Sequence, residues 1–470
     1  MPEAEMKSGK ESGGTPVRKD GRLRLLRNIG VLAVCPQEGG QNEIRPVQNA
    51  AVLWKGDTIL YAGEEAGLQK WLRTQDANTA QRQGRDTGTP KSRLQGDSVP
   101  DASEITTEIF DAGGRLVIPG LIDCHTHLAF GGWRPDEFEM RSLGRTYEEI
   151  AAAGGGILST MKATREASEE ALLEKCDRLL NRIMSLGVTT IECKSGYGLS
   201  VREEMKLLRV YQRLRVESRS RVRIMGTFLG AHAVPPEFRD DREGYVSLVI
   251  DEMIPMAAEQ KLAHFCDVFA DTPAFTIAEA ERILVAAKSR GLIPKIHADQ
   301  LTSNGGAELA ARVGAVSADH LECISEEGVR ALKKAGTIAV SLPLATWYLR
   351  KKPMPARVLI HAGVPVAVST DFNPGSAPSY HLPLAMHLAC TLQHMSPAEV
   401  LKGATIYAAA ALGLREVAGS VEEGKKADFV ELDVNAGGEA GLDAVNQWMY
   451  HFQPDCAVRV WAGGECIVEK

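Results

Sequence analysis

The sequence predicts an α/β fold in which a (β/α)8 TIM barrel is combined with a small β-sandwich domain built from both chain ends. From about residue 112 to 414, short apolar runs alternate with longer amphipathic stretches. This alternation is typical of parallel strands joined by helices. Both chain ends instead carry short strand-like runs with turn signals, at Gly56 and at Gly463-Gly464. We therefore expect the two ends to meet in one β-domain beside the barrel.

Eight segments of the central region have the length and apolar composition of buried strands. The stretch after the fourth of them has clear helix boundaries, since Thr276 can cap it, Glu279 can complete a capping box and Gly291 ends it. Eight strands with intervening helices predict a complete barrel. The expected strands are residues 117–128, 188–196, 223–233, 266–271, 293–299, 317–322, 337–345 and 365–372.

Composition divides the chain into four segments. Residues 1–22 contain almost no apolar side chains, so burial cannot offset their ordering entropy, and we predict a disordered tail. Residues 23–111 supply the first part of the sandwich, and the equally polar residues 74–104 within them are predicted to be a flexible insertion. The barrel is expected over residues 112–404, and the second part of the sandwich over residues 405–470.

Composition and charge exclude several classes of protein. The chain of 470 residues is 44% hydrophobic, which is ordinary for a soluble globular protein. Its formal net charge of −7 argues against a nucleic-acid partner, because phosphate binding requires a strongly basic surface. We expect no membrane partner, since there is no run of 18 apolar residues and no apolar N-terminal signal. The nine scattered cysteines form no CxxC motif, which favours a reducing, cytoplasmic location.

Metal-binding residue types gather at the predicted strand ends, which face the active site in such a barrel. His125 and His127 are two residues apart on the first strand and therefore share a face. Strands five, six and eight end at His297, His320 and Asp371. Three imidazoles and a carboxylate can hold Zn²⁺ or a similar transition metal and leave a position open for water. Taken singly, each histidine could instead be a hydrogen-bonded structural residue, and Asp371 could be a helix cap.

The grouping of the histidines favours one active site over separate structural roles. Only 11 histidines occur in the chain, and a structural explanation would have to account for each of the grouped ones independently. The five histidines at predicted strand ends are His125, His127, His232, His297 and His320.

Several longer motifs resemble the amidohydrolase superfamily, across residues 23–470. They are VIPGLIDCHTHL, IHAD, SADHLE, VSTDFNPG and GSVEEGKKADFV. The phrases HTHLAFGGWRPDEFEMRSLGRTYEEIAAAGGGI, ECKSGYGL, FLGAHAVPPEF and STDFNPGSAPS are more specific, and they resemble members that open a five-membered imidazolone ring. The resemblance implies a hydrolase barrel whose chain ends form a β-sandwich, with one Zn²⁺ or Fe ion per chain, and a homodimer.

The resemblance also implies the reaction and the site residues. The reaction is metal-dependent hydrolysis of the cyclic amide C–N bond of 4-imidazolone-5-propanoate to N-formimidoyl-L-glutamate, a step of histidine degradation. The implied metal ligands are His125, His127, His297 and Asp371. The positions matching substrate contacts are Arg134, Tyr197, His232, Gln300, Asn373, Gly375 and Ser376.

Elementary chemistry agrees with these roles. A cyclic amide is a poor electrophile, and a bound metal can activate water and polarise the carbonyl. Asp371 can take the water's proton and pass it to the leaving nitrogen, while His320 can hydrogen-bond the water or the developing oxyanion. A guanidinium such as Arg134 can bind the propionate carboxylate bidentately. The alternative for Arg134 is an ion pair with Asp136 or Glu137, and the alternative for Tyr197 is a core aromatic residue.

One position departs from the family pattern. Many members carry Glu three residues after the strand-five histidine, whereas this chain has Gln300. Glutamine can donate and accept hydrogen bonds, but it cannot take up a proton. A general-base role at this position is therefore excluded. We expect Asp371 and His320 to share the proton transfers of the reaction.

Two other functions compete with this interpretation. An aminohydrolase (deaminase) of a purine, pyrimidine or triazine ring would have a substrate without an anionic tail, which would leave Arg134 without a role. A metal-free scaffold or binding protein on the same barrel would be expected to have lost ligands, and all four are present. Three histidines and an aspartate suit Zn²⁺ and Fe about equally well, so both metals remain open.

Overall fold

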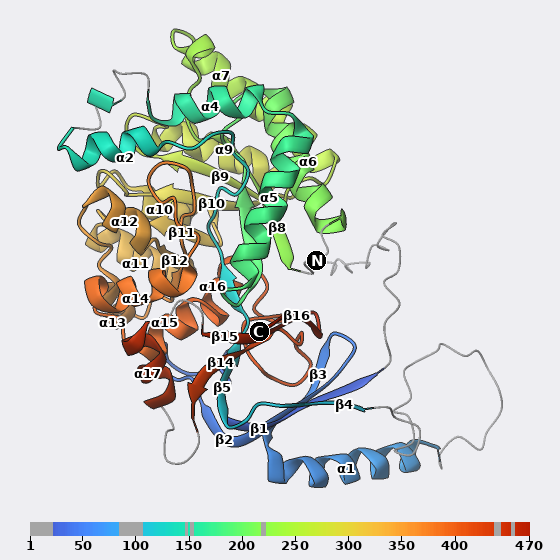
Figure 1. The fold of residues 1–470 in the computed structure, drawn as a ribbon. Helices are drawn as coiled ribbons and strands as arrows, with labels where there is room; N and C mark the ends of the chain where they lie inside the picture. The colour runs from blue at the N-terminus through green and yellow to red at the C-terminus, as the bar shows by residue number, and fades with distance from the viewer. Residues whose placement is uncertain are drawn as a thin grey trace, which may run out of the picture.

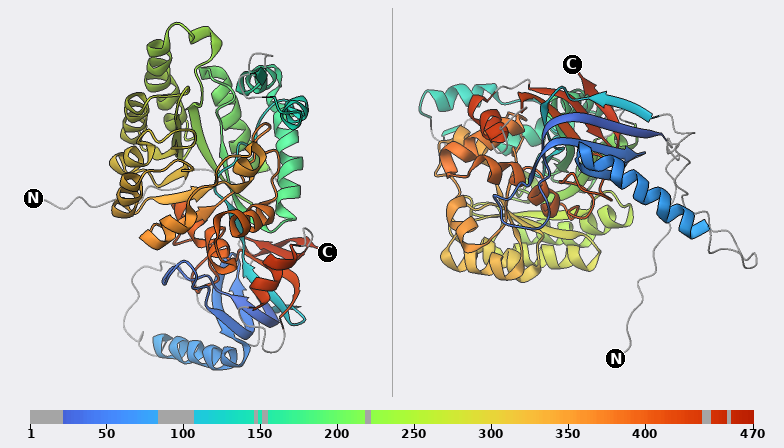
Figure 2. Two further views of the ribbon diagram at one scale, coloured as in Figure 1. Left: turned by 90° about the vertical axis from the view of Figure 1, so that its left-hand side faces the viewer. Right: turned by 90° about the horizontal axis from the view of Figure 1, so that it is seen from below.

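The computed structural model describes residues 22–83, 107–145, 149–150, 155–217, 222–436, 443–452 and 456–470. The predicted disordered tail and residues 84–104 of the predicted insertion lie almost entirely outside these ranges. The described chain forms a helix-covered barrel and a smaller sheet domain. The sheet domain contains both the blue strands near the N-terminus and the red strands near the C-terminus (Figures 1 and 2).

The barrel consists of eight parallel strands in sequence order, which confirms the predicted fold class. Each predicted strand overlaps one of them, although residues 117–119 of the first predicted strand belong to the smaller sheet instead. The strands are almost wholly buried, as expected for a parallel sheet covered on both faces. The strands are β6 (Leu121–Asp123), β7 (Val188–Lys194), β8 (Arg223–Ala231), β9 (Phe265–Ala270), β10 (Ile293–Ala298), β11 (Ser317–His320), β12 (Ile338–Ser341) and β13 (Val366–Val368).

Helices cover the outside of the barrel (Figure 1). In α9, the hydroxyl of Thr276 accepts from Glu279 N and the Glu279 carboxylate accepts from Thr276 N, so the predicted capping box is present. The helices are α2 (Pro135–Ser142), α4 (Ile157–Glu166), α5 (Glu169–Met184), α6 (Val201–Glu217), η1 (Pro236–Phe238), α7 (Arg242–Leu248), η2 (Val249–Met253), α8 (Ile254–Glu259), α9 (Ile277–Ser289), α10 (Gly306–Val313), α11 (Glu326–Ala335), α12 (Pro343–Leu349), α13 (Ala356–Ala362), α14 (Leu382–Gln393), α15 (Pro397–Gly403) and α16 (Ile406–Ala411).

The barrel closes between its first and last strands, just beyond their last residues. Asp371 N donates to His125 O over 3.1 Å, and His127 N donates to Phe372 O over 2.8 Å. The buried carboxylate of Asp123, the last residue of β6, accepts hydrogen bonds from the hydroxyl groups of Ser369 and Thr370, which directly follow β13. The closure therefore brings two predicted metal-ligating segments together.

The small domain is one mixed sheet that contains strands from both chain ends. Its order is β16-β15-β14-β5-β1-β2-β3, with β4 also paired to β1. One face encloses an aromatic core in which Trp54 meets Phe429 and Trp461, with ring centroids 5.1 and 6.2 Å apart. The strands are β1 (Leu23–Ala33), β2 (Pro46–Lys55), β3 (Thr58–Glu64), β4 (Thr107–Asp111), β5 (Arg115–Pro119), β14 (Phe429–Asn435), β15 (Ala457–Ala462) and β16 (Glu465–Glu469).

Two helices of the terminal regions were not expected from the sequence. Helix α1 (Glu65–Gln83) packs Leu68 and Trp71 against the sheet and continues into the first ten positions of the predicted insertion. Helix α17 (Asp443–His451) lies between β14 and β15. No helix in the described part of the chain is both long enough and apolar enough to cross a membrane.

Candidate active site

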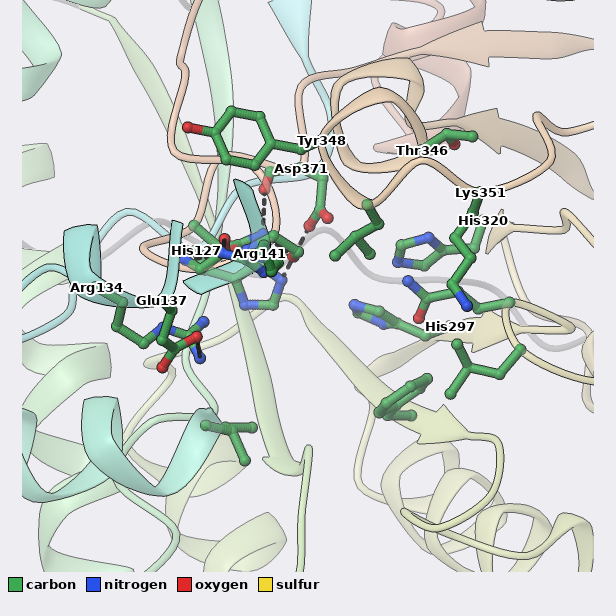
Figure 3. Close-up of a pocket in the computed structure, with 18 of the residues that line it drawn as sticks. His127, Arg134, Glu137, Arg141, His297, His320, Thr346, Tyr348, Lys351 and Asp371 are labelled. Atoms are coloured by element: carbon green, nitrogen blue, oxygen red, sulfur yellow. Dashed lines mark hydrogen bonds and ion pairs between the residues drawn. The ribbon is translucent and has the colours of Figure 1, made fainter. Parts of the chain in front are cut away.

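A pocket of about 1530 Å³ opens at the carboxyl ends of the barrel strands. His127, His297, His320 and Asp371 line it and face a common space (Figure 3). His125 is fully buried next to them, with its ring centroid 4.6 Å from that of His297. The fold therefore brings together all four residues expected to hold a metal, and His320 beside them.

The potential ligand atoms form three overlapping groups that share His125, and two of these groups contain the other pocket-lining histidines and Asp371, while the third contains Glu192 and Asp319. Those of His125, His127 and Asp371 lie within 4.8 Å of one another, as do those of His125, His297 and His320. Asp371 Oδ1 is 3.4 Å from His125 Nε2 and 3.6 Å from His127 Nε2.

The unpartnered nitrogens of this cluster fit a metal ion. His125 Nε2 and His297 Nε2 are buried and have no hydrogen-bond partner among the described residues. A buried polar atom without a partner is unfavourable, and a bound cation would satisfy both nitrogens. His125 Nδ1 lies 2.6 Å from Asp319 Oδ2. A carboxylate can only accept, so the proton sits on Nδ1 and the Nε2 lone pair remains available for a metal.

Backbone conformation turns two of these side chains toward the pocket. His320 has a φ of 81° and Asp371 has a φ of 57°, values that residues other than glycine rarely adopt. Asp299, which directly follows β10, shares this conformation with a φ of 47°. Such left-handed residues are often found at functional sites, where the surrounding structure enforces them.

Burial dominates the electrostatics of the cluster. It lowers the pKa of His125, His127 and His297 well below the usual value, so their imidazoles are neutral, as metal ligands must be. It also raises the pKa of Asp371 to about 7, which the nearby His320 opposes. For His320, burial lowers the pKa, but the Glu322 carboxylate at 3.5 Å contributes to a net rise.

All residues expected to contact substrate line the same pocket. His232 stacks on His127 with ring centroids 5.2 Å apart. Tyr197 lies on a turn held by the buried Glu204 carboxylate, which accepts from Gly198 N over 2.8 Å. The pocket-lining residues predicted from the sequence are Arg134, Tyr197, His232, Gln300, Asn373, Gly375 and Ser376.

Arg134 combines the two alternatives that the sequence left open. Its guanidinium lines the pocket, and Nη1 also pairs with Glu137 Oε2 over 3.5 Å (Figure 3). Its Nε is buried and has no hydrogen-bond partner within the described ranges. A Cβ added to Gly375 would lie 1.4 Å from Nη2 of Arg134, so the guanidinium rests directly against this glycine.

The side chain of Asn373 is engaged within its own loop. Its Oδ1 accepts from Gly375 N over 2.9 Å and from Ser376 N over 2.8 Å. Its Nδ2 donates to Asp371 O over 2.7 Å. Asn373 therefore shapes the loop that carries Gly375 and Ser376, a role that its position in the motif did not reveal.

Sequence reasoning also missed a layer of buried charges beneath the histidines. Lys194, Glu192, Asp267, Lys295 and Asp319 have side chains with 0% exposure. A signal was available, because Glu192 and Lys194 are two residues apart and so share one face of an otherwise buried strand.

Comparisons with known proteins agree with this geometry. Residues 116–467 match the model of the amidohydrolase family. The chain is 51% identical to an imidazolonepropionase of Geobacillus kaustophilus over 361 residues, which cover 77% of this chain and 83% of that protein. It is 45% identical to an imidazolonepropionase of Shouchella clausii over 392 residues, which cover 83% of this chain and 81% of that protein.

Solved structures with the same fold include hydrolases of other names. An E. coli guanine deaminase has a TM-score of 0.68 at 14% identity, covering 95% of this chain and 99% of that chain. A triazine hydrolase from Arthobacter aurescens has a TM-score of 0.69 at 16% identity, covering 95% of each chain. At these identities the likeness concerns the fold alone.

Proposed function

Because the chain belongs to the amidohydrolase family, and within it to the imidazolonepropionases, we propose that its pocket hydrolyses the cyclic amide C–N bond of 4-imidazolone-5-propanoate. The product of this step is N-formimidoyl-L-glutamate, as in histidine degradation. The observation that carries the proposal is that the histidine–aspartate cluster and the guanidinium of Arg134 meet in one pocket.

We assign the metal to His125, His127, His297 and Asp371, with one Zn²⁺ or Fe ion per chain. The unpartnered Nε2 atoms of His125 and His297 and the nearby Asp371 carboxylate support this assignment. When bound, such an ion lowers the pKa of water toward neutrality and polarises a carbonyl.

We assign proton transfer to Asp371 and His320. A carboxylate has two oxygens, so Asp371 can serve as a ligand through one and accept the proton of the attacking water through the other. It can then release that proton to the ring nitrogen as the C–N bond breaks. The Nδ1 of His320 is directed to Glu322, which leaves its Nε2 to hydrogen-bond the water or the developing oxyanion. Gln300 can hydrogen-bond the ring but cannot take a proton.

We assign the propionate carboxylate to Arg134. Its planar guanidinium has an unpartnered, buried Nε and rests on Gly375 at the pocket wall. A carboxylate that accepts from two nitrogens of one guanidinium gains both energy and orientation. The ion pair between Arg134 Nη1 and Glu137 then helps to hold the guanidinium in place.

A turnover assay with freshly prepared 4-imidazolone-5-propanoate tests the proposal, with guanine and cytosine as comparison substrates. We expect turnover of the imidazolone and none of the two amino-substituted rings. Release of ammonia from guanine or cytosine, with no opening of the imidazolone, would support the deaminase alternative instead. A metal-free scaffold is set aside, because the chain belongs to a family of hydrolases and retains the histidine–aspartate cluster.

We also propose that the enzyme is a cytoplasmic homodimer. All nine cysteines are free, which is typical of a reducing compartment. Light scattering on the purified protein measures the assembly directly, and a monomer mass at micromolar concentration would contradict the dimer.

A further inference from the structure

The buried charges beneath the predicted metal ligands form one connected group across four barrel strands. Lys194 comes from β7, Asp267 from β9, Lys295 from β10 and Asp319 from β11, and Glu192 lies two residues before Lys194. Two ammonium groups face three carboxylates, and all five side chains are fully buried. Buried charges persist only when they are paired, so these side chains fix one another's positions.

Lys194 is the centre of this group. Its Nζ lies 2.6 Å from Asp267 Oδ2, 3.0 Å from Glu192 Oε1 and 3.4 Å from Asp319 Oδ2. The same two aspartate oxygens also reach the predicted metal ligands. Asp319 Oδ2 forms a hydrogen bond with His125 Nδ1 over 2.6 Å. Asp267 Oδ2 lies 3.1 Å from His297 Nδ1 as an ion-pair contact, since His297 Nδ1 has no hydrogen-bond partner among the described residues.

These contacts couple two ligands to one ammonium group. A carboxylate at Nδ1 keeps the proton on that nitrogen, sets the rotation of the ring and directs Nε2 away from itself. Without Lys194, the Asp267 and Asp319 carboxylates would face each other and Glu192 with only Lys295 to compensate them. Their mutual repulsion would move them apart, and this movement would alter the orientation of His125 and His297.

We propose that Lys194 is a positioning residue for the metal site, because it holds the two carboxylates that orient His125 and His297. The proposal rests on the proposed function only in requiring that these histidines bind a metal ion. It assigns Lys194 no contact with substrate. The effect of Lys194 is on the affinity and coordination geometry of the metal.

Lys295 provides a matched control within the same layer. It is equally buried and lies 3.1 Å from Glu192 Oε2, close to the corresponding distance of Lys194. It is 4.0 Å from Asp319 Oδ2, which is beyond hydrogen-bond range. Replacing either lysine by methionine removes one buried ammonium and keeps the chain length similar. Only the Lys194 variant removes the ammonium that contacts both the carboxylate next to His125 and the carboxylate next to His297.

The test compares Lys194→Met and Lys295→Met in the full-length protein. Zn²⁺ affinity is measured by competition with a chromophoric chelator, the Co²⁺-loaded proteins are compared by visible absorption, and unfolding midpoints are recorded. We expect Lys194→Met to weaken Zn²⁺ binding about 10- to 100-fold, the range typical for lost outer-shell support of metal ligands. We also expect it to alter the Co²⁺ spectrum. Lys295→Met should bind Zn²⁺ with an affinity within about threefold of wild type, even if its unfolding midpoint falls as far as that of Lys194→Met.

If Lys194→Met does not fold, Asp319→Asn serves as the alternative test, with Ser317→Ala as its control. Ser317 Oγ donates to the other oxygen of the same carboxylate over 2.6 Å. Ser317→Ala therefore removes a hydrogen bond to Asp319 but leaves the contact between Asp319 and His125 in place. Asp319→Asn should weaken Zn²⁺ binding and Ser317→Ala should not. If wild type, Lys194→Met and Asp319→Asn bound Zn²⁺ with equal affinity, the positioning role of Lys194 would be overturned and the proposed function would be unaffected. A wild-type protein that binds no Zn²⁺ and no Fe would instead overturn the proposed function.

Discussion

Asp371 and His125 are bonded through their backbones at the point where their side chains meet. Asp371 N donates to His125 O over 3.1 Å, and Asp371 Oδ1 lies 3.4 Å from His125 Nε2. The first and last strands of the barrel are joined by the same bond. The spacing of two predicted metal ligands is therefore set by closure of the barrel itself.

Removal of Asp123 should weaken this closure and the metal site together. Its buried carboxylate accepts from Ser369 Oγ and from Thr370 Oγ1 and N. Asp123→Ala leaves those donors buried and unpaired, which we expect to lower the free energy of unfolding by about 3 kcal/mol, with weaker Zn²⁺ binding. Chemical denaturation and metal titration measure the two effects. Unchanged stability would contradict the role given to this residue.

Loss of one predicted ligand should abolish metal binding without unfolding the chain. We expect His297→Ala to retain much less than one metal ion per chain by elemental analysis and to lose activity. His361→Ala, which changes an exposed histidine on α13, is the control and should keep both. Full activity of wild type after exhaustive chelation, with no metal detected, would contradict a metal-dependent reaction.

The barrel and the positions of the site histidines were predictable, because they depend on local patterns. Buried parallel strands are continuous apolar runs, and strand ends at one edge of a barrel bring residues such as His297 and His320 together. The capping box of α9 depends only on Thr276 and Glu279, three residues apart.

The buried ions and the terminal helix α1 were not predictable in the same way. Lys194 and Lys295 are buried only because carboxylates from other strands pair with them, and a charged residue on its own indicates exposure. Helix α1 packs through Leu68 and Trp71, and most of its other residues are polar or small, so it shows little hydrophobic periodicity. The hydrogen bonds of Asn373 within its own loop were not predictable either, because they are visible only in three dimensions, and its predicted contact with substrate stays a prediction.

Glu322 should affect turnover through His320. Its Oε1 is 3.5 Å from His320 Nδ1 and accepts from Thr346 Oγ1 over 3.1 Å. We expect Glu322→Gln to lower kcat at least about tenfold, with KM and metal content near wild type, since the imidazole loses its orienting anion. In a His320→Ala background the same change should have no further effect. Additive losses in the double variant would show that Glu322 acts independently of His320.

Gly375 should be required for the position of Arg134. A Cβ at residue 375 would lie 1.4 Å from Arg134 Nη2, so Gly375→Ala must displace the guanidinium. We expect KM for the imidazolone to rise about tenfold or more, while metal content and unfolding midpoint stay near wild type. In an Arg134→Ala background, Gly375→Ala should change KM little. A Gly375→Ala enzyme with wild-type KM would show that the guanidinium has room to move without consequence.

Substitution of Arg134 tests the proposed substrate rather than the class of enzyme. A hydrogen bond to a charged carboxylate contributes roughly 1.5–3 kcal/mol, which is about ten- to hundredfold in binding. Arg134→Ala should therefore lower kcat/KM for 4-imidazolone-5-propanoate by at least that factor, with metal content unchanged. Arg134→Lys should restore only part of it, because an ammonium cannot reproduce the planar fork of the guanidinium. The ion pair with Glu137 needs its own control, because Arg134→Ala also removes it. Glu137→Gln breaks that pair but keeps the guanidinium, so its loss of kcat/KM should be smaller. Wild-type kcat/KM in Arg134→Ala would show that this arginine does not bind the propionate carboxylate, and the substrate assignment would lose its structural support.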